Sequence, residues 1–328
     1  MLTMARLLDA LRLHRLFHRG LMLLACVTVL FANAEASAGD SKSVDCRYEP
    51  SEVVEPDVVL EGGFLPTSDV FRPLLADVKE PRFAAAIQRV SFDPGILSTQ
   101  TTGQGIWAGV VSFGSILGLY GWRSEQSCDG VQISLAGGVF SQFNLDAPSV
   151  PLINSDFIIG VPVTFRSGRF SGRVHLYHQS SHLGDEFILF NPQVERIDLG
   201  YEIVDVVLSL QDHWWRVYGG GGYIIHSQTD DFARGKAQAG IEFRAYDWQV
   251  SLFDDDQIEP VLGLDATSFA ERDWGITFSA KGGLSASANH STRHIRVMAV
   301  FMRGFYPFGQ FFDDDQLTNY GLEAQFEY

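Results

Sequence analysis

The chain has 328 residues, of which 46% are apolar and 20% charged, and its formal net charge is −16. A chain of this length and apolar content can bury a sizeable core, which argues against a disordered protein. Its strong acidity argues against nucleic acid as a partner, because phosphates require a basic surface.

The first 38 residues have the composition of a secretory signal peptide. A basic region with four arginines precedes a short apolar core at residues 21–32, and small residues follow at 36–38. The core is shorter than the roughly 20 residues that a membrane-spanning helix needs. We therefore predict a cleaved signal peptide over residues 1–38 and export of the remaining chain.

Residues 39–80 are acidic, contain several prolines and show no clean hydrophobic period. They are predicted to form a periplasmic N-terminal segment, with a short strand at 58–64. Two cysteines remain after the signal peptide, Cys46 and Cys128, and in an oxidising compartment they either pair or stay free. No cysteine or histidine spacing typical of a zinc site occurs.

From residue 81 onward, segments of roughly 10 to 16 residues alternate between apolar and polar side chains, which indicates β-strands. The clearest is the last one, where Tyr320, Leu322, Ala324 and Phe326 fall on one face. Membrane barrel strands need about 9–11 residues, whereas soluble strands average about 5–6. Residues 81–328 are thus predicted to form an all-β transmembrane antiparallel β-barrel of about 12 strands (10–12), with a secreted soluble β-protein as the alternative. The segments are 82–92, 105–122, 130–145, 154–166, 169–180, 194–211, 213–227, 235–246, 258–269, 273–286, 293–305 and 317–328.

The end of the chain also points to the bacterial outer membrane. The last strand ends on the aromatic residue Tyr328. In this the chain resembles bacterial outer-membrane barrels, whose final strand is recognised by assembly factors. The predicted partners are outer-membrane lipids and the barrel assembly machinery, and most tryptophans lie near segment ends, as an interfacial girdle requires. A barrel of this size has a narrow lumen, which long polar side chains are expected to fill. The side chains assigned to the lumen are Arg166, Arg173, Glu202, Glu242, Arg244, Lys281 and Arg296.

The stretch from His178 to Glu186 holds the residues most suited to chemistry. His178 and Ser180 are two apart on one strand, so they share a face and form a minimal base–nucleophile pair. Val174 and Leu176 precede them on that face, which places the pair on the lipid side. Glu195, assigned by parity to the lipid side of the next strand, is the predicted third member that orients His178.

Several alternatives stay open for this stretch. Asn191, Asp185 and Glu186 are other candidates for the third member, and Asp185 with Glu186 suits a hard cation such as calcium. Ser181 and His182 are further candidate site residues, and His178 with His182 is a candidate metal pair that lacks a third ligand. A purely structural role, as a hydrogen-bonded rim that orders an external loop, is the remaining interpretation. No organic cofactor is indicated.

The His-x-Ser pair followed by an acid resembles the active sites of outer-membrane phospholipase A and of the lipid A 3-O-deacylase. The sequence departs from that pattern after the pair, where Ser181-His182-Leu183 replaces an Asn-Gly or Asn-Ala step. The whole mature chain resembles an uncharacterised bacterial family, domain of unknown function 1207. That likeness is carried by residues 71–77, 80–83 and 178–186, and it implies an envelope protein of unassigned activity.

Three functions follow from these observations. The first is an outer-membrane barrel with an unassigned envelope role. The second is a serine esterase that acts on outer-membrane lipid, with Ser180 as nucleophile, His178 as base and Glu195 as the orienting group. The third is a narrow channel for small solutes.

Overall fold

The computed structural model describes residues 60–66, 69–92, 105–124, 129–192, 194, 196–245, 248, 250, 256–288, 293–311 and 316–327. The chain divides into two compact units, residues 1–43 and 44–328, and all described residues belong to the second. The predicted signal peptide, Cys46, Cys128 and Glu195 lie outside the described residues.

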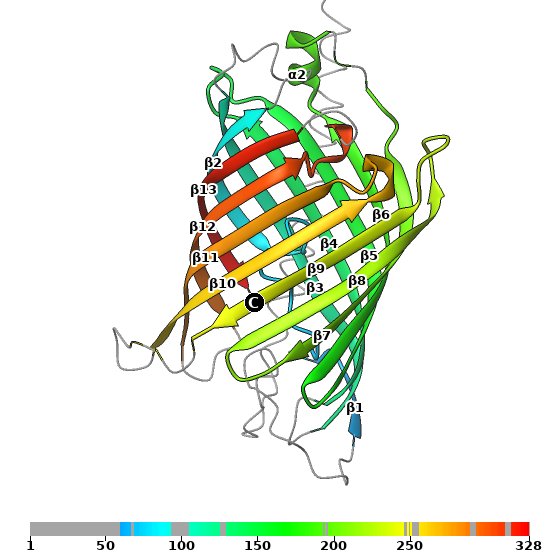
Figure 1. Ribbon diagram of the computed structural model, residues 1–328, viewed down its shortest axis with the longest axis vertical. Coiled ribbons are helices and arrows are strands. Elements are labelled where there is room, and N and C mark those ends of the chain that lie inside the picture. Colours follow the sequence, from blue (N-terminus) through cyan, green and yellow to red (C-terminus); the bar gives the residue numbers. More distant parts are fainter. Residues whose placement is uncertain are drawn as a thin grey trace, which may run out of the picture. The chain divides into compact units, whose positions relative to one another are not determined.

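Strands β2 to β13 of the described chain form a closed antiparallel barrel (Figure 1). Each strand pairs with the next one in sequence, and β13 pairs with β2 to close the ring. The twelve-stranded barrel predicted from the alternation is confirmed. The strands are β1 (Leu60–Phe64), β2 (Phe83–Phe92), β3 (Ile106–Ser124), β4 (Gly130–Asn144), β5 (Leu152–Ser167), β6 (Phe170–Leu183), β7 (Gly200–Gln211), β8 (Trp215–Ser227), β9 (Gly235–Arg244), β10 (Asp256–Phe269), β11 (Ile276–Ala288), β12 (His294–Phe305) and β13 (Gln316–Glu327).

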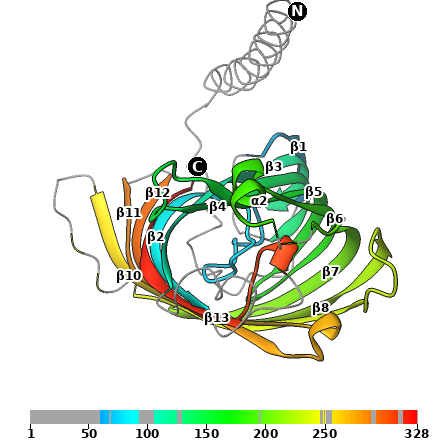
Figure 2. The same cartoon turned by 90° about the horizontal axis from the view of Figure 1, so that it is seen from above.

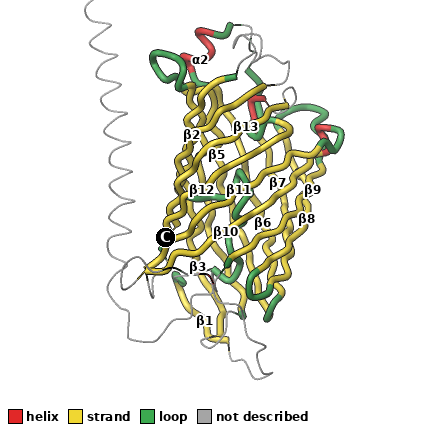
Figure 3. The backbone as a smooth tube through the Cα atoms, turned by 60° about the vertical axis from the view of Figure 1, so that its left-hand side comes forward, coloured by secondary structure: helices red, strands yellow, loops and turns green. Residues whose placement is uncertain are grey.

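The short helices lie outside the strands. α2 (Asp185–Phe190) follows β6, and two 3-10 turns, η2 (Ala270–Arg272) and η3 (Gly309–Phe311), follow β10 and β12. Among the described residues, no helix has the length and apolar character needed to cross a bilayer. Figure 3 shows α2 at one end of the barrel and β1 at the other, and these are called the α2 end and the β1 end below.

The two faces of the barrel wall differ in polarity. Along β12, Ile295, Val297 and Phe301 point outward and are exposed, whereas Arg296 and Met298 point inward and are buried. The same alternation leaves large apolar side chains exposed on the outer face of the other strands. This pattern is typical of a wall that contacts hydrocarbon on its outer side. Examples are Ile87, Phe113, Ile159, Leu176, Leu262, Leu284 and Leu322.

Residues 69–82, here called the interior segment, run inside the ring of strands, where Figure 2 shows them as the blue trace. The Phe71 ring lies 4.4 Å from the Arg216 guanidinium and 5.1 Å from that of Arg173. The Leu75 N–H donates to Glu242 Oε1 at 2.7 Å. The sequence analysis assigned residues 39–80 to the periplasm without this interior course. The sequence of residues 69–82 does not reveal this course through the lumen, because the segment is held by contacts with strands that are distant along the chain.

Buried ion pairs attach the interior segment to the wall. Glu80 accepts two hydrogen bonds from the Arg173 guanidinium, at 2.6 and 3.1 Å, and Lys79 Nζ lies 2.5 Å from Asp156 Oδ2. Because these groups satisfy one another, the segment remains in the lumen despite its charges.

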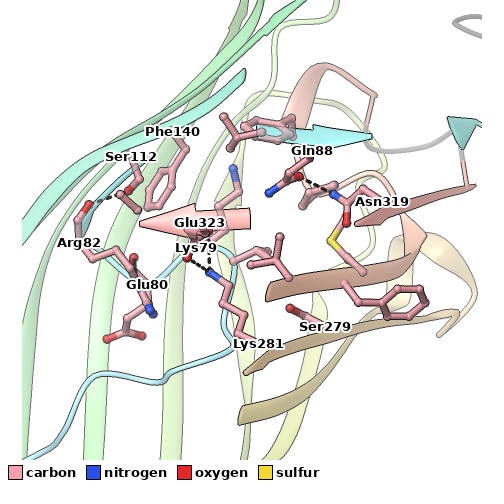
Figure 4. A pocket seen from close by; sticks show the side chains of 18 residues that line it. Lys79, Glu80, Arg82, Gln88, Ser112, Phe140, Ser279, Lys281, Asn319 and Glu323 are labelled. Atoms are coloured by element: carbon pink, nitrogen blue, oxygen red, sulfur yellow. Dashed lines mark hydrogen bonds and ion pairs between the residues drawn. The ribbon is translucent and has the colours of Figure 1, made fainter. Parts of the chain in front are cut away.

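Little space is left inside the described part of the barrel. A cavity of about 60 Å³ lies beside the interior segment, lined by Lys79, Ser279, Lys281 and Glu323 among others (Figure 4). The assignment of long polar side chains to the lumen is confirmed for all but one residue. Those buried inside are Arg166, Arg173, Glu242, Arg244, Lys281 and Arg296, and the exception is Glu202.

Candidate active site

Strand β6, which leads into α2, presents His178 and Ser180 on the outer face of the barrel, close to its last residue, Leu183. Both are half-buried, whereas Tyr177 and Gln179 on the opposite face are buried. The outward course follows from the alternation, because Leu176 shares this parity and is exposed. The structure therefore places the histidine and the serine side by side on the lipid-side surface.

Strand register brings a carboxylate beside His178. His178 pairs with Glu202 on β7, which pairs with His226 on β8. Nδ1 of His178 lies 2.8 Å from Glu202 Oε1, and Nδ1 of His226 lies 2.7 Å from Glu202 Oε2. The three side chains form a row across neighbouring strands, with each carboxylate oxygen bound to one imidazole.

The lumen assignment of Glu202 is therefore wrong, and the reason is the parity of β7. Val204, Val206, Leu208 and Leu210 point outward, so the even-numbered Glu202 does too. The opposite face carries the buried polar residues Asp205, Ser209 and Gln211. The sequence analysis took Tyr201 and the odd-numbered residues before it as the side chains that face lipid. Tyr201 instead faces inward, and the earlier residues precede the start of β7. The apolar side chains at every even position from 204 to 210, against Asp205 and Ser209 at odd positions, are the sequence signal for the correct parity.

Two other predicted candidates face away from His178. Ser181 points into the lumen, where its hydroxyl donates to Asp156 Oδ1 at 2.5 Å and lies 3.2 Å from Asn154 Oδ1. Asn191 is buried at the end of α2, and its amide donates to the Phe187 carbonyl at 2.6 Å. In these positions both side chains are buried and hydrogen-bonded to groups other than His178.

The remaining candidates lie around the end of β6. His182 is exposed and meets the ring of Phe157 edge-on at 5.8 Å. Asp185 lies 3.6 Å from the Arg196 guanidinium, and Glu186 accepts a hydrogen bond from the Ser149 hydroxyl. In the part of the chain that the structure describes, no three histidine, cysteine or acidic side chains are arranged to hold a metal ion.

The surface around Ser180 is apolar. Its cross-strand neighbours are Phe157 on β5 and Gly200 on β7, and Ile159 lies opposite His178. Phe157 and Ile159 are exposed, as is Leu189 on α2. A hydroxyl and an imidazole on one strand face are thus surrounded by exposed apolar side chains.

Comparison with known families identifies this chain. A family model described as "Protein of unknown function (DUF1207)" matches residues 30–328. The chain belongs to this family. The resemblance inferred from the sequence is thus confirmed for DUF1207, and no curated protein matches the chain.

Solved structures similar to this DUF1207 protein are outer-membrane barrels. Outer membrane phospholipase A from Escherichia coli is 12% identical with a TM-score of 0.49, over 76% of this chain and 92% of that chain. The Salmonella typhi outer membrane phospholipase dimer with bound calcium is 13% identical with a TM-score of 0.49, over 79% and 96%. LpxR from Salmonella typhimurium is 9% identical with a TM-score of 0.34, over 74% and 97%.

Proposed function

We propose that this DUF1207 protein is an outer-membrane serine hydrolase that cleaves acyl esters of membrane lipids. Ser180 is the nucleophile, His178 the general base and Glu202 the group that orients His178. The observation that carries the proposal is the 2.8 Å hydrogen bond between His178 Nδ1 and Glu202, on the outer face and next to Ser180.

The geometry supplies the parts that such a reaction needs. An ionised carboxylate only accepts hydrogen bonds, so Nδ1 of His178 carries the proton and Nε2 is left as the base. In the first step Ser180 Oγ attacks the acyl carbonyl while its proton passes to Nε2. Collapse of the tetrahedral intermediate breaks the ester bond, and His178 returns the proton to the leaving alcohol. Water then releases the fatty acid from Ser180 by the same two transfers.

Position limits the class of substrate. Ser180 faces outward among exposed apolar side chains, so a substrate reaches it from the bilayer and not through the lumen. The α2 end faces the exterior if the termini lie in the periplasm, and the site then meets the outer leaflet. Phospholipid and the acyl chains of lipopolysaccharide are the esters found there. Calcium bound by Asp185 and Glu186 stays a prediction, as does assembly through β13 by the barrel assembly machinery.

The decisive experiment is hydrolysis by the purified full-length protein in mixed micelles of phospholipid or lipid A. We expect fatty acid release by the wild type and its loss, by at least about 10³-fold, in Ser180→Ala and His178→Ala. Ser181→Ala is the matched control, because Ser181 is adjacent but faces the lumen, and it should retain activity.

Absence of hydrolysis by the folded wild type over both lipid classes would refute the proposal. The row of His178, Glu202 and His226 would then be a structural rim at the α2 end. Cell fractionation tests the proposed location, since the protein should be recovered with the outer membrane and only in detergent.

A further inference from the structure

A glutamine side chain lies on the same outer surface, one strand beyond the serine's neighbour. Ser180 pairs with Gly200, and the Gln228 N–H donates to the Gly200 carbonyl at 2.8 Å. Gly200 has no side chain. The position that a Cβ would occupy on it is 2.5 Å from Gln228 Oε1 and 3.3 Å from Nε2. The Gln228 amide thus covers Gly200 and lies beside Ser180.

The distances fit a hydrogen bond to the reacting carbonyl. Cβ positions of directly opposite residues in an antiparallel pair are about 4.5–5.5 Å apart. A carbonyl carbon attached to Ser180 Oγ therefore lies over the gap that Gly200 leaves, with the amide on its far side. A donor that stabilises an oxyanion needs to come within about 2.7–3.1 Å of that oxygen. Because Oε1 and not Nε2 is the nearer atom, a rotation of the glutamine amide is required for Nε2 to donate to that oxygen.

The side-chain amide of Gln228 is available to donate to an oxyanion, whereas the backbone N–H of Ser181 is not. The Gln228 side chain is exposed and forms no hydrogen bond with the described residues. The N–H of Ser181, which follows the nucleophile, donates to the Leu199 carbonyl at 3.1 Å. That strand-ladder bond removes the donor that most directly follows the serine, so a side chain is needed in its place.

From these contacts we infer that Gln228 is a further catalytic residue, whose Nε2 donates a hydrogen bond to the oxyanion formed when Ser180 attacks the ester. The inference rests on the proposed function and deepens it. It also assigns a purpose to Gly200, because any larger side chain there would separate the amide from Ser180 and displace it.

The test compares kcat and KM for lipid-ester hydrolysis by the full-length protein. Gln228→Ala and the isosteric Gln228→Glu, which lacks the N–H donors, should each lower kcat by roughly 10²–10³-fold with little change in KM. Asp230→Asn, in the same exposed turn, is the control and should leave both constants unchanged.

A second variant displaces the Gln228 amide without changing its chemical identity. Gly200→Ala introduces a methyl group where the Gln228 amide lies, and we expect it also to lower kcat. In a Gln228→Ala background the same change should add no further loss, since both substitutions remove one interaction. Independent, multiplicative losses would overturn the inference.

The outcomes separate the two proposals. If Ser180→Ala abolishes hydrolysis but Gln228→Ala leaves kcat unchanged, or raises only KM, the serine hydrolase stands and the role of Gln228 is refuted. If the wild type and Ser180→Ala hydrolyse lipid esters equally, or neither does, the serine hydrolase and the role of Gln228 are both refuted.

Discussion

At the scale of single residues, the shared carboxylate of Glu202 is the feature on which the proposed chemistry of the site depends. Each of its oxygens is bound to Nδ1 of one imidazole, on His178 and on His226. This arrangement fixes the tautomer and the ring orientation of His178, which is what the third member of a hydrolase triad does. Glu195, the third member predicted from sequence, lies outside the described residues and stays a prediction.

Two glutamine substitutions distinguish these carboxylates. Glu202→Gln removes the charge that stabilises protonated His178, so we expect kcat to fall by roughly 10²–10⁴-fold. Glu195→Gln, the same substitution in the segment before β7, should leave kcat within a factor of about two, since Glu202 already occupies Nδ1. Steady-state hydrolysis of a lipid ester measures both. A larger loss in Glu195→Gln would instead favour the sequence-derived triad.

At the scale of elements, the interior segment and the wall depend on each other through buried charges. Glu80 and Arg173 are both almost fully buried, and two hydrogen bonds join them. Removal of one partner from such a pair leaves an uncompensated charge in a medium of low dielectric constant. The stability of the barrel is therefore sensitive to a residue that is not part of any strand.

The Glu80–Arg173 pair gives a quantitative prediction. Glu80→Gln should lower the free energy of unfolding by about 3–5 kcal/mol, measured by urea unfolding in lipid vesicles. The double variant Glu80→Leu with Arg173→Met should recover much of that loss, because it leaves no unpaired charge. A Glu80→Gln barrel as stable as the wild type would show that the Glu80–Arg173 pair contributes nothing to stability.

The C-terminal strand gives a second prediction at this scale. β13 closes the ring through β12 and β2, and Phe326 lies on its exposed outer face. Phe326→Ser should reduce the amount of protein inserted in the outer membrane several-fold in cells, while Phe278→Ser, an outward phenylalanine on β11, should reduce it less. Equal effects of the two changes would contradict a special role of β13 in assembly.

At the scale of the whole molecule, an apolar outer wall encloses a lumen filled by charged side chains and the interior segment. The two cavities beside the interior segment are each about 60 Å³, which is room for a few water molecules. The proposed chemistry thus lies on the outer surface, and the buried ion pairs lie in the interior. The narrow-channel interpretation of the sequence thus requires displacement of the interior segment.

Planar-bilayer recordings test this arrangement. The wild-type barrel should give no steady ion conductance, because residues 69–82 occupy the lumen. Replacement of residues 70–79 by a short Gly/Ser linker should produce measurable conductance, provided that circular dichroism shows an intact barrel. Steady conductance by the wild type would indicate that the interior segment leaves the lumen, and it would favour the channel.

Properties that are local along the chain were determined by the sequence alone. Alternation with a period of two and segment length fixed the barrel class, limited the strand count to 10–12 and set most of the strand bounds, since both follow from which side chains contact hydrocarbon. The outward course of His178 and Ser180 followed in the same way from Leu176 on their face.

Contacts between distant parts of the chain were decided only by the tertiary structure. The register between β6, β7 and β8 brings Glu202 to His178, and the course of residues 69–82 through the lumen pairs Glu80 with Arg173. A shift of one residue in a strand reverses the face of every side chain. An error of one residue in the parity of β7 therefore assigned Glu202 to the lumen, although it lies on the outer face. Alternation within one strand carries no information about its partner across the sheet.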